Sequence, residues 1–217
     1  NDGSLTAAAS GTVAIGSQTL NNLSSGQRNV AVGYNTMLET TIGDSNIAIG
    51  YQAMLGDGGF QNDNNIAIGS SNPDGTLAAM GGQWATAAST HNIAIGTGSM
   101  AGAMDGALYN TAVGHQAGTA IEEGNKNTLL GYQAGIGIVD SDWNTCVGDR
   151  AGDSITSGQA NTVIGTTADC AATVSNQIAI GNGSVTTAQF GIAIGDQVSA
   201  GGNDAVMGKS GAIITVD

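Results

Sequence analysis

A short motif recurs twelve times along the 217 residues of this chain and constrains its fold more than any other feature. The motif is Asn, three apolar or Thr residues, then Gly, as in the stretch NIAIG. The most frequent spacing between copies is 17 residues, which is too short for a helix-turn-helix repeat but enough for two short strands and two turns. The motif glycines are Gly16, Gly33, Gly50, Gly69, Gly96, Gly114, Gly131, Gly148, Gly165, Gly181, Gly195 and Gly208.

Each copy is expected to form one coil of a parallel β-solenoid of about twelve coils, an all-β fold in a single repeat domain over residues 1–217. The less regular stretch after each glycine, such as YNTM or HQAG, predicts a return strand. Stacked coils would then form two parallel sheets, with about 4.8 Å between strands and a rod of roughly 55 Å. Two Phe and two Trp leave Ala, Val and Ile to fill a thin interior, which suits a narrow coil.

The three central motif positions predict a lateral partner for the coil. The middle position is never polar, and the third is always Val, Ile, Leu or Met. Adjacent residues on a strand point to opposite faces, so these two positions cannot both face the interior of one coil. Because no helical segment is predicted to cover the second apolar face, another copy of the chain is expected to cover it.

Eight motif asparagines are expected to stack in register as a structural ladder. Stacked amides can hydrogen-bond along the rod, and Asn tolerates the left-handed turn conformation. The ladder comprises Asn29, Asn46, Asn65, Asn92, Asn110, Asn127, Asn144 and Asn161.

The charge of the chain excludes two classes of partner. Only four basic residues oppose seventeen acidic ones, for a net charge of −13. Nucleic acid and anionic membrane surfaces are bound by clustered cations, so neither is an expected partner. No apolar run is long enough to cross a bilayer, so no membrane insertion by this segment is expected.

Groups that could carry catalysis are few. His91 and His115 are the only histidines, and neither lies in a nucleophile motif. Cys146 and Cys170 match no zinc spacing, and Cys146 occupies a position that is Ala, Val or Leu in other copies, which indicates a buried apolar residue. The prediction is that the protein is not an enzyme. A glycan-cleaving spike, with two carboxylates about 5 to 10 Å apart across a subunit interface, is an alternative.

Asp57 and Asp63 are the candidate metal ligands, in a stretch where oxygen donors lie among glycines as in calcium turns. The stretch does not repeat with the nonapeptide period of calcium-binding β-helices. Asp140 and Asp142 form a second candidate pair. An ordinary polar turn is the preferred interpretation in both places, so no metal site and no cofactor are predicted, with calcium as the alternative.

Aromatic residues are the candidate ligand-binding residues. The spacing between Gly69 and Gly96 rises to 27 residues, which predicts an inserted loop at about 70–91 that carries Trp84. A long loop on a regular scaffold is a usual place for function, and the amphipathic Trp84 ring suits a sugar or a protein contact. Its alternative role is to cap the insertion. Another candidate is a row of Tyr34, Tyr51 and Tyr132, which either faces a glycan or stacks from coil to coil. Trp143 is interpreted as local packing.

The motif N-[VIT]-A-[VI]-G resembles the YadA-like head repeat of trimeric autotransporter adhesins, and the forms NTAVGHQAG and NTLLGYQAG are similar to repeats of bacteriophage tail fibres and spikes. The resemblance covers residues 12–208. It implies a left-handed β-roll, a homotrimer and a role in attachment to cells or matrix. The coils are longer here than in the adhesin head and match its shorter period only near Gly195.

The expected function is that of a non-enzymatic, extracellular fibre or adhesin segment, located at a cell surface or on a virion. Its expected partners are further copies of itself and a cell-surface glycan or protein receptor. The alternatives are a phage tail-fibre or spike segment that binds a host glycan, and a purely structural filament or spacer.

Overall fold

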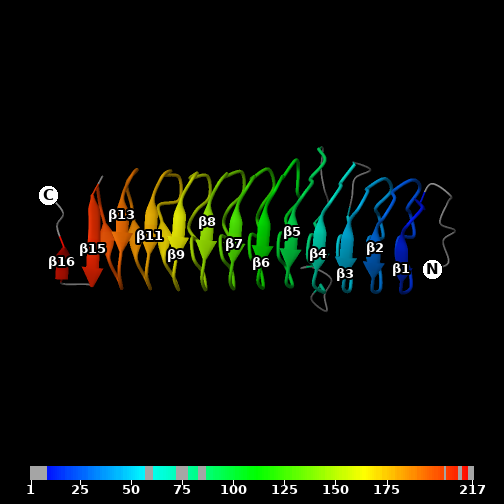
Figure 1. The fold of residues 1–217 in the computed structure, drawn as a ribbon, viewed down its shortest axis with the longest axis horizontal. Coiled ribbons are helices and arrows are strands. Elements are labelled where there is room, and N and C mark those ends of the chain that lie inside the picture. Colours follow the sequence, from blue (N-terminus) through cyan, green and yellow to red (C-terminus); the bar gives the residue numbers. More distant parts are fainter. Residues whose placement is uncertain are drawn as a thin grey trace.

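The computed structural model describes residues 9–56, 61–71, 78–82, 87–202, 204–209 and 212–214. These residues form a parallel β-solenoid of about eleven turns and include no α-helix (Figure 1). The predicted all-β solenoid is confirmed. Strands β1 (Val13–Ile15) and β16 (Ala212–Ile214) lie at opposite ends of the rod.

Every motif copy forms one short strand, and these strands stack in sequence order. Each pairs in parallel with the next in the same register, so that Ala31 lies beside Ala48 and Val32 beside Ile49. A final strand, β16 (Ala212–Ile214), pairs antiparallel with the last motif strand. The motif strands are β1 (Val13–Ile15), β2 (Val30–Val32), β3 (Ile47–Ile49), β4 (Ile66–Ile68), β5 (Ile93–Ile95), β6 (Thr111–Val113), β7 (Thr128–Leu130), β8 (Thr145–Val147), β9 (Thr162–Ile164), β11 (Ile178–Ile180), β13 (Ile192–Ile194) and β15 (Ala205–Lys209).

The predicted return strand is wrong for most of the rod. Among the described residues the second sheet has three strands, β10 (Asp169–Cys170), β12 (Val185–Thr186) and β14 (Ser199–Ala200), all in the C-terminal coils. In the 17-residue coils, the second and fourth residues after the motif glycine are left-handed, as in Gln133 (φ 53°) and Gly135 (φ 57°). Two left-handed residues so close together fold the backbone into turns instead of an extended strand.

The middle residue of each motif strand faces the interior of the rod. Ala31, Ala48, Leu129 and Cys146 are fully buried, as are their counterparts in the other strands from β2 to β13. The opposite wall of the interior is formed by the fourth residue after the motif glycine, which is a buried Met in several coils. The thin apolar core expected from the composition is therefore present, with methionine as an additional filler.

Large and small side chains are exchanged across this interior in several coils. Three coils with Ala in the strand have a buried Met six residues later, as in the pair Ala31 and Met37. Leu129 is instead followed by Gly135, where an added Cβ would lie 2.6 Å from Leu129 Cδ2. In these coils one large residue from either wall fills the same space, as close packing requires.

This exchange of large and small residues predicts that one substitution can compensate for another in the same coil. Leu129→Ala should lower the free energy of unfolding by about 3 kcal/mol, because it leaves a cavity in the interior. The double variant Leu129→Ala with Gly135→Met should recover at least half of that loss, because it recreates the pair Ala31 and Met37. Met37 already has a φ of 50°, so the left-handed φ of Gly135 does not exclude Met. Urea unfolding, monitored by circular dichroism, measures the free energy of unfolding of the single and the double variant. A double variant that is less stable than Leu129→Ala alone would contradict the exchange of large and small residues between the two walls.

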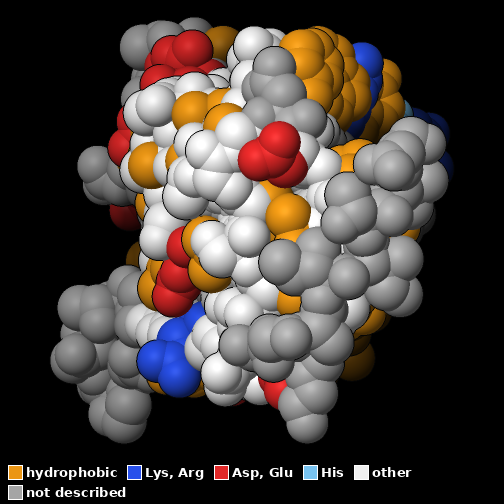
Figure 2. Space-filling model, turned by 90° about the vertical axis from the view of Figure 1, so that its left-hand side faces the viewer, with side chains coloured by type: hydrophobic (Ala, Val, Ile, Leu, Met, Phe, Trp, Pro, Cys, Tyr) orange, Lys and Arg blue, Asp and Glu red, His pale blue; other side chains and the backbone are white. Residues whose placement is uncertain are grey.

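The first and third residues of each motif strand face outward, and many are exposed in the single chain. The exposed fraction is 59% for Ile15 and 48% for Leu130, with Ile49, Ile95 and Ile164 also exposed. The second apolar face inferred from the sequence is therefore an open surface on this chain. Figure 2 looks along the rod from the end that carries β16 and shows hydrophobic side chains gathered at the upper right, together with Lys or Arg side chains.

The eight motif asparagines are buried and joined from coil to coil. The backbone N–H of each one from Asn46 to Asn161 donates to Oδ1 of the preceding motif asparagine, at 2.9 or 3.0 Å. Each Nδ2 donates to a carbonyl in the turn before the next coil, as from Asn127 to Ser141 O at 2.7 Å. The left-handed residue is the one that precedes each asparagine of the ladder, not the asparagine itself.

Candidate functional site

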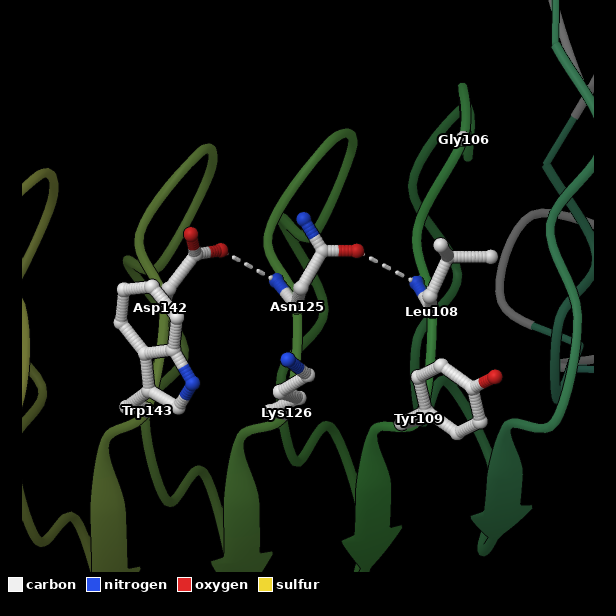
Figure 3. A pocket seen from close by; sticks show the side chains of 7 residues that line it. All are labelled: Gly106, Leu108, Tyr109, Asn125, Lys126, Asp142 and Trp143. Carbon is white, nitrogen blue, oxygen red and sulfur yellow. Dashed lines mark hydrogen bonds between the residues drawn. The ribbon is translucent and has the colours of Figure 1, made fainter.

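A surface pocket of about 290 Å³ extends over three consecutive coils, at the turns that precede β6, β7 and β8 (Figure 3). Two exposed aromatic rings, one amine, one carboxylate and one amide line it. The lining residues are Gly106, Leu108, Tyr109, Asn125, Lys126, Asp142 and Trp143.

The asparagine ladder positions the outer row of the pocket. Tyr109, Lys126 and Trp143 each immediately precede a buried motif asparagine and have left-handed φ values of 60°, 56° and 57°. The asparagine is held in the interior, and the exposed side chain before it extends outward. Because the coils stack in register, this pre-asparagine row has one side chain per coil, at a spacing of about 4.8 Å.

A second ladder fixes the polar wall of the pocket. Leu108 N donates to Asn125 Oδ1 at 2.8 Å, and Asn125 N donates to Asp142 Oδ1 at 2.7 Å (Figure 3). The backbones are also joined, from Lys126 N to Leu108 O and from Trp143 N to Asn125 O. The three turns are therefore held together, so the pocket is preformed on a rigid scaffold.

The outer row combines aromatic and cationic groups. Tyr109 is 54% exposed and Trp143 is 52% exposed. Lys126 Nζ lies 5.5 Å from the centroid of the Trp143 ring, within the range of a cation–π contact. On the other side, the His91 ring lies 5.0 Å from the Tyr109 ring, so the row extends over four coils. Flat rings with adjacent donors and acceptors can stack on a ligand and orient it.

The predicted tyrosine row lies at the other end of the strands, after the motif glycines. Tyr34 stacks on Tyr51 with centroids 5.8 Å apart, and Tyr132 stacks on His115 at 5.6 Å. Ser70 and Thr97 occupy the equivalent positions between these two pairs. The structure therefore brings the three tyrosines into two separate stacks. Trp84 lies outside the described residues, as does much of the inserted loop.

Of the candidate metal ligands, Asp57 lies outside the described residues. Asp63 Oδ1 accepts a hydrogen bond from Asp44 N at 2.7 Å, and Asp44 Oδ1 accepts one from Gln27 N. These carboxylates thus repeat the turn-joining role of Asn125 and Asp142. Among the described residues no group of three or more His, Cys, Asp or Glu side chains could hold a metal ion.

Buried titratable groups lie at the C-terminal end of the rod. Cys146 and Cys170 are buried free thiols. Burial raises the pKa of Cys146 well above its usual range and the pKa of Cys170 to about 11, so both remain protonated at neutral pH. Burial also raises the pKa of Asp169, whose Oδ1 accepts a hydrogen bond from Cys170 N.

The pocket includes residues that the sequence-based analysis did not select. Trp143 was interpreted as local packing, yet half of its surface is exposed beside Lys126. The sequence does contain a pattern that indicates this site. The position before the motif asparagine holds an aromatic or basic residue in four consecutive copies, namely His91, Tyr109, Lys126 and Trp143. Asp142 was a candidate metal ligand for which an ordinary polar turn was the preferred interpretation, and here its Oδ1 accepts a hydrogen bond from Asn125 N in the preceding turn.

Comparison with known proteins gives no match to a family model, a curated sequence or a solved structure. In the part of the chain that the structure describes, no helix is long and apolar enough to cross a membrane. The functional argument therefore starts from the surface of the rod itself.

Proposed function

We propose that the protein is a non-enzymatic attachment segment of an extracellular fibre or adhesin, built as a left-handed β-roll from three parallel copies. The copies would pack side by side through the outer face of the sheet formed by the motif strands. The turns and loops around this common core would then be free to contact a receptor on a cell surface or matrix.

The exposed outer face is the observation that carries this proposal. Its exposed apolar members include Ile15 near one end of the rod, Leu130 in the middle and Ile164 beyond it. No first or third position of the motif strands from β1 to β13 carries a charge. Soluble monomers rarely expose an apolar patch that runs along their whole length, so this face is expected to be covered.

A second copy of the chain fits this face better than an unrelated partner. The outer residues recur at the coil spacing of about 4.8 Å, so a parallel copy presents rows with the same spacing over the entire rod. The net charge of −13 is carried outside these positions, which lets equal chains approach through the face. A closed ring of copies around one axis buries every face and leaves none to continue into an aggregate.

Light scattering on the purified protein tests the proposal. The wild type should have three times the chain mass of 21.2 kDa. Leu130→Glu introduces a charge at the centre of the outer face and should give one chain mass, with an unchanged circular dichroism spectrum. Ser157→Glu adds the same charge at an exposed turn residue and should remain trimeric. A monomeric wild type, or a trimer that tolerates Leu130→Glu, would contradict association through this face.

A further inference from the structure

We infer that the pocket of Tyr109, Lys126 and Trp143 binds a neutral oligosaccharide that lies along the axis of the rod. This inference deepens the proposed attachment function and rests on it, because it gives the rod a class of receptor. The sugar rings would stack on Tyr109 and Trp143, and Lys126, Asn125 and Asp142 would form the polar side of the site.

The two rings lie two coils apart, and each contacts one neighbour in the pre-asparagine row, His91 for Tyr109 and Lys126 for Trp143. Tyr34 and Tyr51 occupy adjacent coils and stack on each other, as do His115 and Tyr132. Tyr109 and Trp143 are instead separated by the coil of Lys126, and Figure 3 shows both rings on the same side of the turns with Lys126 between them. About half of the surface of each residue is exposed beside the pocket, so the part of each ring that these neighbours leave uncovered is available to a ligand.

The spacing of the platform fits an extended sugar chain. Two coil rises put Tyr109 and Trp143 about 9.6 Å apart along the rod. This is comparable to the length of one disaccharide unit in a β-1,4-linked chain of hexoses. In such a chain alternate sugars are related by a near-half turn, so the same face recurs once per disaccharide. Both rings can therefore stack on equivalent sugars of one straight chain.

The polar groups favour a neutral sugar over an acidic one. Lys126 can donate to hydroxyl groups and Asp142 can accept from them, and together they carry no net charge. An acidic sugar would gain one ammonium partner but would meet Asp142 and a chain of net charge −13. Aromatic faces with a few placed polar groups are the usual composition of a small-molecule site. The combination selects for apolar sugar faces and hydroxyl groups.

Isothermal titration calorimetry with soluble hexasaccharides tests the inference. The probes are cellohexaose, β-1,4-linked mannohexaose and chitohexaose, with the β-1,4-linked hexamer of mannuronic acid as the acidic comparator. At least one neutral probe is expected to bind at least tenfold more tightly than the acidic hexamer. Absence of binding by all three neutral probes, or tighter binding of the acidic one, would overturn the inference.

Two variants and one matched control locate the binding. Tyr109→Ala and Trp143→Ala should each weaken binding of the neutral probe at least tenfold. Alanine is accepted in this row, since Ala160 occupies the same place in the next coil with a φ of 56°. Tyr34→Ala removes an exposed tyrosine from the other end of the strands and should bind as the wild type does. Equal affinity in all variants would overturn the assignment of the site.

The mass of each protein separates this inference from the proposed function. Every sample is measured by light scattering before titration. A trimer that binds no neutral probe overturns the oligosaccharide inference and leaves lateral association intact. A monomer that binds the probe through Trp143 supports the site and contradicts the trimeric fibre.

Discussion

Gly148→Ala is expected to lower the melting temperature of the rod by about 10 °C, the equivalent of about 4 kcal/mol in the free energy of unfolding. Gly148 ends β8 with a φ of 138°, a conformation that L side chains rarely adopt. A Cβ at this position would lie 2.5 Å from the carbonyl oxygen of Gly165 in the next coil. Both the strained backbone and the overlap oppose the substitution, and neither can relax without separating two coils.

Gly201→Ala is the matched control for this experiment. Among the described residues, no atom other than those of its chain neighbours lies within 4 Å of a Cβ added at Gly201, and its φ is outside the left-handed range. The melting temperature of Gly201→Ala, measured by circular dichroism, should match that of the wild type. Hydrogen exchange should show increased opening in the coils on both sides of residue 148, because each coil of a solenoid contacts only its neighbours. Equal melting temperatures of the two variants would contradict the close approach of the motif glycines.

Asn127→Leu is expected to cost about 4 kcal/mol by interrupting the asparagine ladder. Asn127 is buried, its Oδ1 accepts from Asn144 N at 2.9 Å, and its Nδ2 donates to Ser141 O. Leucine has a similar volume but provides neither group, so a buried donor and a buried acceptor both lose their partner. Each unsatisfied buried group costs about 1–3 kcal/mol.

Urea unfolding of Asn127→Leu should be compared with that of Asn182→Leu. Asn182 is exposed and hydrogen-bonds to Asp196 at the surface, so its replacement should change the free energy of unfolding by less than about 0.5 kcal/mol. If Asn127→Leu lowered the free energy of unfolding by no more than Asn182→Leu does, the asparagine ladder would contribute little to stability. In that case the strand register would depend on the apolar interior alone.

The different sides of each coil have different structural roles. The asparagine ladder and the motif glycines set the distance and register between coils, while the outer sheet face carries the exposed apolar rows. The residues before each motif asparagine are free to vary, and they include Ser45, His91, Tyr109, Lys126 and Trp143. A row that varies on an invariant scaffold is where a ligand site can be built without loss of the fold.

The sequence by itself determined the coil and its strands. A middle residue that is never polar, between an outward position that is apolar or Thr and an outward apolar position before a glycine, predicts a short strand in the motif, and every copy forms one. The repeated motif also determined that the asparagines stack, since it places equal residues in equal positions of successive coils although their spacing ranges from 17 to 27 residues. These features depend on local pattern and repeat length, both of which a single sequence displays.

The tertiary structure alone decided the course of the return segment and the location of the pocket. Met37, Gln133 and Met54 adopt left-handed φ values that isolated residues of these types avoid, because hydrogen bonds between coils, such as Met37 N to Ala53 O, stabilise that backbone. Residue type gives no indication of such a conformation. Tyr109 and Trp143 are 34 positions apart in the sequence, and only stacking in register unites them with Lys126 in one hollow.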